Sequence, residues 1–384
     1  MGKKIPTSVS FNLPDGKEVT IETGKLATQA HGSVVVRIED TMILATIVSA
    51  YEPRENAAFF PLSVDYQEKY AAVGRIPGNF FRRETRLNDY EILISRLVDR
   101  AIRPLFPDGY MHDTQVILTL HSSDQRNLPD AYAALAASAA IVVSDINWNG
   151  PISEVRVAKI NGEYVVNPEK EALESAELEI IVAATMDNVM MVEGEANECQ
   201  EADLIEAIKV GHEAIKVQCK AQLELAQLVG EAATVKRVLP EAPSSDEAFA
   251  LVKEVTTDKI IAVAHGAMDK VTRKDALKAI KSELKEAAAE KGDEWMAEHG
   301  SFISAYFDKH KKATLREVVM SEKVRLDGRA TDQVRPIWTE VDYLPAAHGS
   351  AIFNRGETQA LASLTLGTKL DKKMEDTALA QTYE

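Results

Sequence analysis

Apolar and β-branched residues at alternating or consecutive positions predict that the first part of the chain is rich in β-strands. Residues 19–22 alternate between apolar and polar, whereas 34–37 and 42–49 are almost continuously apolar. Both patterns are typical of strands that bury one face or two. A hairpin turn is expected at Glu39-Asp40, and a second tight turn at Asn161-Gly162. Further strands are expected at 59–66, 115–121, 155–160, 163–166, 179–185 and 189–193.

Two segments within this β-rich part have helical patterns. Residues 127–145 contain AYAALAASAAIVVS, which is apolar on nearly every side and therefore predicts a buried helix. Residues 200–230 predict a long amphipathic helix. Its expected apolar side carries Leu204, Ile208, Ile215, Leu223 and Leu228.

The pattern changes after the turn-forming segment 240–245, PEAPSS, which is typical of a linker. Residues 246–312 are expected to be almost wholly helical. This part shows no candidate chemistry, and His265, His299 and His310 lack the spacing of a metal site. At Val324 the strand pattern returns.

An internal repeat links the two β-rich parts. HGSAIFNRGETQALASLTLG at 348–367 aligns without gaps on HGSVVVRIEDTMILATIVSA at 31–50. Both copies have the pattern of a β-hairpin, and a repeat this far apart indicates a duplicated domain. We therefore expect domains at 1–235, 240–318 (all helical) and 321–384, and we expect the last to be an incomplete second copy.

Composition limits the function classes. The 384 residues have a formal net charge of −16, which argues against a general polyanion-binding protein. Two cysteines, Cys199 and Cys219, are too few for a disulfide framework, so reduced thiols are expected. No run approaches the roughly 18 apolar residues of a membrane helix. With no apolar signal region at the start, the cytoplasm is the expected location and no membrane partner is expected.

The stretch 74–107 is locally basic, with seven arginines against four acidic residues. Its first third has the breakers of a loop and presents Phe80, Phe81, Arg82 and Arg83 in succession. Bases stack on aromatic rings and phosphates pair with guanidinium groups, so this loop is a candidate site for single-stranded nucleic acid. The alternative, that the rings fill a core gap and the arginines form internal ion pairs, stays open.

A helix is expected to follow this loop. Asn88 or Asp89 can cap it, Pro104 ends it, and the expected apolar stripe is Ile92, Leu93, Leu97 and Ile102. Three arginines share a face, and Asp99 can pair with the last of them. The further candidates for phosphate or RNA contact are Arg86, Arg96, Arg100 and Arg103.

The string GNFFRRE at 78–84, followed by DRAIRPLFP at 99–107, resembles the RNA-contacting loop and first helix of the bacterial polynucleotide phosphorylase family. RLDGR at 325–329 and VRPI at 334–337 resemble the opening signature of an RNase PH domain. The resemblance implies an α/β fold with mixed sheets: one RNase PH-like domain, a helical domain and the start of a second RNase PH-like domain.

The resemblance also implies an activity. Family members degrade mRNA from the 3′ end, using inorganic phosphate to release nucleoside diphosphates, and the reverse reaction adds nucleotides. It implies a homotrimeric ring, single-stranded RNA as partner, other RNA-degradation proteins as candidate partners, and Mg²⁺ held by carboxylates of residues beyond Glu384. Phe80, Phe81, Arg82 and Arg83 then contact RNA, no catalytic or metal-binding residue falls within 1–384, and the chain alone is expected to be inactive.

Two other interpretations stay open. The chain could instead be a non-catalytic RNase PH-like ring subunit that acts as scaffold and RNA channel, because such a subunit would have much the same sequence over these residues. A generic nucleotide-binding enzyme is disfavoured because neither a P-loop nor a GxGxxG motif occurs. Within the first copy, residues 121–124 (HSSD) and 193–195 (EGE) are polar clusters without a recognisable phosphate loop, and we interpret both as structural.

Overall fold

The computed structural model describes residues 5–54, 57, 59–77, 84, 86–239, 244–372, 374–379 and 381–383. The chain divides into two compact units. The first comprises Met1–Pro240 and Lys372–Glu384, and the second comprises Glu241–Asp371. No helix in the described part of the chain is long and apolar enough to span a membrane.

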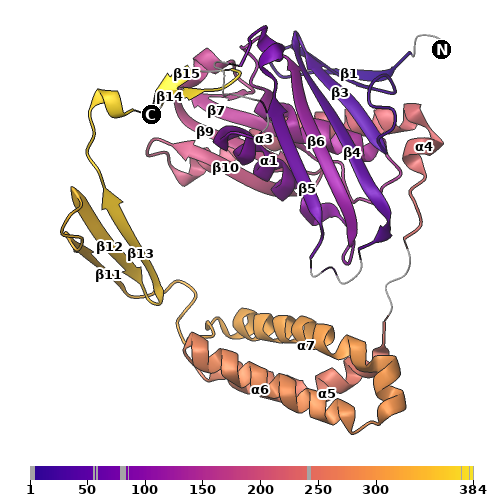
Figure 1. Cartoon of the computed structure of the whole chain (residues 1–384), viewed down its shortest axis with the longest axis vertical. Helices are drawn as coiled ribbons and strands as arrows, with labels where there is room; N and C mark the ends of the chain where they lie inside the picture. The colour runs from indigo at the N-terminus through magenta and orange to yellow at the C-terminus, as the bar shows by residue number, and fades with distance from the viewer. Residues whose placement is uncertain are drawn as a thin grey trace. The chain divides into compact units, whose positions relative to one another are not determined.

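A six-stranded sheet forms one layer of the first unit, with strand order β1-β2-β3-β4-β6-β5 (Figure 1). Neighbouring strands are antiparallel, except that β5 and β6 are parallel. The five strands predicted between residues 19 and 121 are confirmed, and four of them are longer than predicted. The strand predicted at 59–66 forms at Leu62–Glu68 instead, and β1 is an additional strand, so the sheet has six. These are β1 (Thr7–Asn12), β2 (Glu18–Thr23), β3 (Gly32–Ile38), β4 (Thr41–Pro53), β5 (Leu62–Glu68) and β6 (His112–Ser122).

A second, antiparallel sheet has the order β10-β9-β7-β8. Its strands are β7 (Ser153–Ile160), β8 (Glu163–Val166), β9 (Ala176–Ala184) and β10 (Val189–Ala196). Asn161 and Gly162 join β7 to β8 with φ of 51° and 83°. Positive φ at both central residues is the requirement of a tight hairpin turn, so the predicted turn is confirmed.

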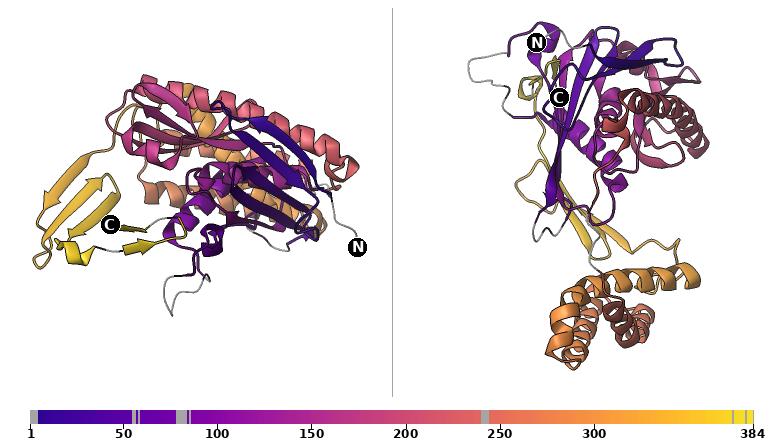
Figure 2. Two further views of the ribbon diagram at one scale, coloured as in Figure 1. Left: turned by 90° about the horizontal axis from the view of Figure 1, so that it is seen from above. Right: turned by 90° about the vertical axis from the view of Figure 1, so that its right-hand side faces the viewer.

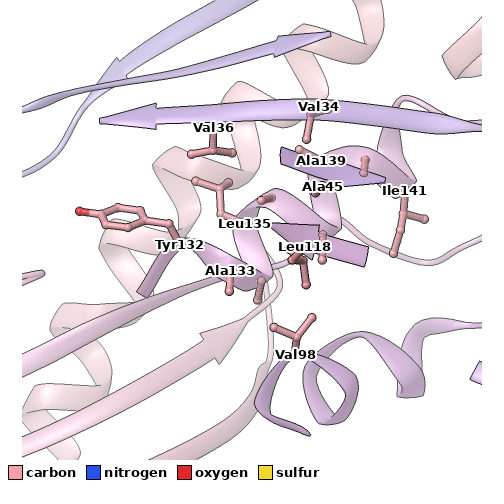
Figure 3. Packing of buried hydrophobic residues seen from close by; sticks show 14 of the residues in the cluster. Val34, Val36, Ala45, Val98, Leu118, Tyr132, Ala133, Leu135, Ala139 and Ile141 are labelled. Carbon is pink, nitrogen blue, oxygen red and sulfur yellow. The ribbon is translucent and has the colours of Figure 1, made fainter. Parts of the chain in front are cut away.

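The apolar segment predicted to be buried forms the short 3-10 helix η3 (Pro129–Tyr132) and helix α2 (Ala133–Val142). Every residue of α2 is buried, because the helix contacts β3, β4 and β6 of one sheet and β7 of the other. Figure 3 shows Leu135 and Ala139 of this helix beside Val34, Ala45 and Leu118 of the first sheet. A Cβ at Gly32 would lie 1.9 Å from the carbonyl oxygen of Ala140, so only glycine permits this close approach.

Helix α1 (Asp89–Ile102) packs against β5, and η2 (Arg103–Leu105) follows it. Asn88 caps α1, as predicted, in a reciprocal capping box with Glu91. The predicted apolar stripe is wrong in part, because Ile92 and Leu93 are 44% and 48% exposed. The face that is buried carries Ile94, Leu97, Val98, Ala101 and Ile102.

The long helix α3 (Glu201–Val229) is also confirmed, and the short helix α4 (Glu231–Thr234) follows it. Its predicted apolar side is wrong in part: Leu223 and Leu228 are exposed. The helix instead buries small and amide residues against β7 and β9, and a Cβ at Gly211 would meet Val157 at 3.0 Å. Ile215 and Leu225 are also buried on this face, so close backbone approach and apolar packing together fix which face points inward.

The second unit begins with three helices that pack against one another (Figure 1; Figure 2, right). They are α5 (Asp246–His265), α6 (Lys270–Ala289) and α7 (Asp293–Glu322). The predicted helical segment is thus confirmed and continues to Glu322. Its core contains Leu251, Val252, Ile260, Leu284 and Phe307.

A three-stranded sheet of β11 (Ile337–Val341), β12 (Gly349–Arg355) and β13 (Thr358–Leu364) follows in this unit. The hairpin β12–β13 pairs Gly349 with Leu364, which is the same register as Gly32 with Ile47 in β3–β4. His31 Nδ1 accepts the amide of Ser49 at 3.0 Å, and His348 Nδ1 accepts the amide of Leu366 at 2.9 Å. The repeated sequence therefore forms the same hairpin twice, as predicted.

Candidate functional site

The predicted RNA-contacting loop residues Phe80, Phe81, Arg82 and Arg83 lie outside the described residues. The structure describes the residues on either side of this segment. The 3-10 helix η1 (Tyr70–Val73) follows β5, and Gly74 ends it with φ of 68°. Glu84 is described on the other flank. The two flanks therefore define where the candidate loop begins and ends.

Tyr70 forms backbone hydrogen bonds with a residue on each side of the segment: Arg75 before it and Glu84 after it. The amide of Arg75 donates to the Tyr70 carbonyl at 3.0 Å, and the amide of Tyr70 donates to Glu84 Oε1 at 2.8 Å. Glu84 also accepts Gln67 Nε2 through its carbonyl at 3.1 Å, and its carboxylate lies 3.5 Å from Lys69 Nζ. The described residues on the two sides of 78–83 are therefore hydrogen-bonded to each other near the end of β5.

This point is itself tied to α1 by buried hydrogen bonds. The amide of Glu68 donates to Glu91 Oε1 at 2.7 Å, and the amide of Tyr66 donates to Ser95 Oγ at 2.9 Å. Glu91 is only 5% exposed and also closes the capping box. The end of β5 and the start of α1 are thus joined by one buried hydrogen-bonded network.

The three arginines of α1 and η2 differ in the number of ion pairs and hydrogen bonds that they make within the chain. Arg96 is exposed and makes no ion pair within the described part of the chain. Arg100 Nη1 lies 2.5 Å from Glu193 Oε2 at the surface. Arg103 binds both carboxylate oxygens of Asp99 at 2.6 Å and donates to the carbonyls of Phe60 and Leu62.

The predicted Asp99–Arg103 pair is therefore confirmed. Of the three helix arginines, Arg96 retains the most capacity for an external phosphate. Arg86, the fourth candidate, is exposed beside the loop. Arg103 instead uses its donors to hold α1 against β5.

The structure contains a cleft of about 600 Å³ between α1 and the second sheet, which was not predicted from the sequence. Two cations, Arg156 and Lys170, face a larger number of carboxylates there. The carboxylates are Glu68, Asp130, Glu174, Glu179, Glu193 and Glu195. Such a lining repels phosphate.

The one buried cation of this cleft is already neutralised. Arg156 pairs with Asp130 through Nη2 and with Glu179 through Nη1, the latter at 2.7 Å. Tyr90 donates its hydroxyl to Asp130 Oδ2 at 2.9 Å. Burial, with smaller contributions from nearby carboxylates, raises the pKa of Glu68 to about 7. The cleft therefore lacks a free guanidinium for a phosphoryl group.

The sequence held one signal of this cleft. Arg156 stands within an apolar strand, between Val155 and Val157, and a charge there needs a buried partner. Which carboxylates supply it depends on the packing of α1 and η3 on the second sheet. No periodicity within one element reveals that arrangement.

The two polar clusters of the first copy have structural contacts. Asp124 Oδ1 accepts the amides of Arg126 and Asn127 at 2.8 and 2.9 Å, which is a turn arrangement. Glu193 pairs with Arg100. Among the residues that the structure describes, no group of three or more His, Cys, Asp or Glu could hold a metal ion.

Comparisons with known proteins agree with this architecture. Family models described as "3' exoribonuclease family, domain 1" and "domain 2" match residues 15–147 and 150–214. A third, "Polyribonucleotide nucleotidyltransferase, RNA binding domain", matches 248–330.

Curated relatives named polyribonucleotide nucleotidyltransferase match almost the whole chain. One from Bacteroides fragilis is 52% identical over 99% of this chain and 53% of its own length. One from Cytophaga hutchinsonii is 50% identical over 96% and 51%. One from Porphyromonas gingivalis is 49% identical over 98% and 50%. This chain thus spans about half the length of the curated relatives it matches.

A solved chain titled "archaeoglobus fulgidus exosome with RNA bound to the active site" is 19% identical and aligns with a TM-score of 0.42. It covers 53% of this chain and 90% of its own. At that TM-score the likeness supports no conclusion about this chain. The family models and the identities to relatives confirm the predicted resemblance. The chain belongs to the 3′ exoribonuclease family and is similar, over nearly its whole length, to the N-terminal half of polyribonucleotide nucleotidyltransferases.

Proposed function

We propose that this chain is the RNA-binding N-terminal part of a phosphorolytic 3′-to-5′ exoribonuclease, a polyribonucleotide nucleotidyltransferase that degrades mRNA. Its identity of about half to relatives with that name carries the proposal. The match of 248–330 to an RNA-binding domain adds support. The reaction passes the 3′-terminal phosphoryl group of RNA to inorganic phosphate, and the reverse reaction extends RNA.

In this proposal, Phe80 and Phe81 stack on bases while Arg82 and Arg83 pair with phosphates. The supporting observation is the anchored base of the segment. Tyr70 is hydrogen-bonded to Arg75 and to Glu84, so the residues that flank the segment are held together. We therefore expect a smaller loss of conformational entropy when the segment binds RNA. Arg96 and Arg86 extend the basic surface beside it.

The proposal includes a divalent metal, Mg²⁺, which in this reaction class neutralises charge on the transferred phosphoryl group. From the family resemblance we place its carboxylate ligands outside residues 1–384. We further propose a homotrimeric ring, a cytoplasmic location and other RNA-degradation proteins as partners. The first of these is testable by sedimentation equilibrium, where a mass three times that of the chain is expected.

A second candidate function is favoured by the acidic cleft. Because its Arg156 is neutralised and its lining repels phosphate, this cleft is unsuited to phosphorolysis. That favours a non-catalytic RNase PH-like ring subunit, in which RNA would be held by the basic loop and not by this cleft. A Ser-rich phosphate loop and a carboxylate pair elsewhere in the full-length protein would favour the enzyme over this alternative.

The test is equilibrium binding of labelled oligoadenylate by the purified chain. Replacing Phe80 and Phe81 together by Ala is expected to cost about 1–3 kcal/mol for each unstacked base. Replacing Arg82 and Arg83 together by Ala is expected to weaken binding and flatten its salt dependence. Matched controls are Phe59→Ala, at a ring that is 75% exposed, and the double variant of the exposed Arg37 and Arg126.

Affinity and salt slope unchanged in both loop variants, with folding intact, would contradict the assigned role of the loop. Failure of the unaltered chain to bind oligoadenylate at all would contradict RNA binding by this chain.

A further inference from the structure

The helical unit carries a groove between α6 and α7 whose lining is strongly basic, although the chain as a whole has a net charge of −16. The groove measures about 390 Å³, and one acidic residue, Asp308, lines it. Its cations are Lys270, Arg273, Lys274, Lys278, Lys281 and Lys311. Sequence patterns gave this unit no chemistry, and the groove is a feature of the folded helices.

Charge is segregated around α6. With 3.6 residues per turn, Lys270, Lys274, Lys278 and Lys281 fall on one side of the helix. The acidic residues Glu283 and Glu286 fall away from this side, and Glu283 pairs with Lys259 of α5 at 2.5 Å. Asp275 falls between the two sides, about 60° from Lys278 around the helix. A helix stabilised by its own ion pairs would intersperse the two signs. The segregation leaves one face with an uncompensated positive field.

Some of these cations are held in place and others are free. Lys281 and Lys311 contact Asp308 at 2.9 and 2.6 Å, and both lie over the ring of Phe307. These contacts fix one end of the groove.

Three cations remain available. Lys270, Lys274 and Lys278 are exposed and make no ion pair within the part of the chain that the structure describes. Three ammonium groups on one exposed helical face are available to an external anion.

The spacing of the lysines and the burial of Phe307 indicate what kind of anion this face would bind. Lys270 to Lys281 spans about 16 Å of helix at 1.5 Å per residue, which suits an extended ligand with several negative charges better than a single small ion. Phe307 is only 2% exposed, so the one ring of the groove cannot stack on a base. Lysine ammonium groups are point charges that bind phosphate without reading base edges.

We propose that the face of α6 that carries Lys270, Lys274 and Lys278 binds the sugar–phosphate backbone of single-stranded RNA, without sequence preference. This rests on the proposed function in that RNA is the polyanion on which the chain acts. A family model described as an RNA-binding domain already matches this unit. The proposal deepens the function by naming three lysines on one helical face as the contact, separate from the loop at 80–83. The acidic remainder of the chain repels RNA, which favours binding at the basic surfaces, namely this face and the loop at 80–83.

The first test is lysine footprinting of the whole chain. The chain is acetylated with an amine-reactive reagent with and without oligoadenylate, and each site is quantified by mass spectrometry. Lys270, Lys274 and Lys278 are expected to be protected by RNA. The matched reference sites are Lys209, Lys216 and Lys220 on α3, which are expected to react equally in both conditions. Equal reactivity of the α6 lysines with and without bound RNA would overturn the proposal.

The second test replaces the three α6 lysines by Gln and compares them with the same change at Lys209, Lys216 and Lys220. Both variants alter net charge equally and keep good helix formers. The α6 variant is expected to lower the slope of log affinity against log salt by about 2, because each single-strand phosphate contact contributes roughly 0.7. The α3 variant is expected to retain the slope of the unaltered chain.

The outcomes separate this proposal from the loop assignment. Binding that is lost in the loop variants and unaffected in the α6 variant overturns the α6 surface alone. Binding weakened by the α6 variant while the loop variants bind normally supports it and overturns the loop. Protection of the α6 lysines by polyglutamate as strong as that by RNA would overturn the assignment to RNA and indicate an acidic protein partner. Equal affinity for oligoadenylate and oligouridylate supports backbone binding, whereas a strong preference contradicts it.

Discussion

The backbone amide of Tyr70 donates a 2.8 Å hydrogen bond to the carboxylate of Glu84, so the two flanks of the segment 78–83 are joined directly. Glu84 precedes α1, and Tyr70 follows β5. The bond therefore holds together the described residues on the two sides of the candidate RNA-binding segment.

Glu84→Ala is expected to weaken oligoadenylate binding roughly three- to tenfold, although no base or phosphate contact is removed. The reason is that an unanchored loop loses more conformational entropy when it binds. Fluorescence anisotropy with labelled oligoadenylate measures the effect. Glu84→Gln keeps an oxygen for the Tyr70 amide and is expected to bind like the unaltered chain. Equal affinity for the Ala variant and the unaltered chain would show that the flanks need no anchor.

Arg103 and Arg100 are expected to differ in their effect on stability. Arg103→Ala removes a bidentate pair with Asp99 and two hydrogen bonds to the carbonyls of Phe60 and Leu62, so a loss of about 1–3 kcal/mol is expected. Arg100→Ala removes one exposed ion pair and is expected to cost less than about 0.5 kcal/mol. Thermal unfolding measured by circular dichroism gives both values. A larger loss for Arg100→Ala would contradict the assignment of Arg103 as the residue that holds α1 to β5.

The buried carboxyls predict a stability that falls as pH rises. Burial raises the pKa of Glu68 to about 7 and that of Glu154 to about 8. The folded chain therefore holds these protons more tightly than the unfolded chain, so stability is highest below about pH 4.5 for these groups and decreases through pH 7 and 8. The Glu68 shift alone corresponds to ~3 kcal/mol, at about 1.4 kcal/mol per pKa unit.

Unfolding midpoints at pH 5, 6.5 and 8 test this expectation. Glu68→Gln and Glu154→Gln cannot ionise, so each is expected to reduce the difference between the midpoints at pH 5 and pH 8. The exposed Glu171→Gln controls for the change in net charge and is expected to keep the difference of the unaltered chain. If neither buried variant changes the slope, both carboxyls are ionised in the folded chain and the assigned cause is wrong.

We expect no phosphate-dependent release of ADP when the purified chain is mixed with oligoadenylate, phosphate and Mg²⁺. The acidic cleft of the first copy repels phosphate, and its Arg156 is occupied by Asp130 and Glu179. Without charge neutralisation, positioned RNA remains uncleaved. A mock preparation from the same host measures contaminating enzyme. ADP release above that background, strictly dependent on phosphate, would place a working phosphate site within residues 1–384.

The order of strands and helices could be predicted from the sequence because the signals are local. Alternation, apolar runs and the turn at Asn161-Gly162 depend on neighbours along the chain, and the structure confirms them. The repeat predicted a duplicated hairpin, and the structure contains it twice. The two copies share a detail: His31 in one and His348 in the other accept a hydrogen bond from a backbone amide. The family followed from rare strings such as GNFFRRE, and the comparisons confirm it.

The faces of the helices depended on tertiary packing. Ile92 and Leu93 have the hydrophobicity of core residues, yet α1 turns its other side to β5 because Ser95 and Glu91 bond to the strand amides there. On α3, Gly211 permits contact with β7 that a larger residue would prevent. Periodicity states that a helix has an apolar side, whereas hydrogen bonds and backbone approach select which side is buried.

The sequence by itself determined the secondary structure, the duplication, the family and the candidate loop residues, because each of these is written in residues close together along the chain. Only the tertiary structure decided that Glu84 and Tyr70 close the base of the loop, that Asp130 and Glu179 neutralise Arg156, and that α6 presents free lysines beside α7. Electrostatic and hydrogen-bonding partners are chosen by distance in space, and charges far apart in sequence meet only after the sheets and helices have packed.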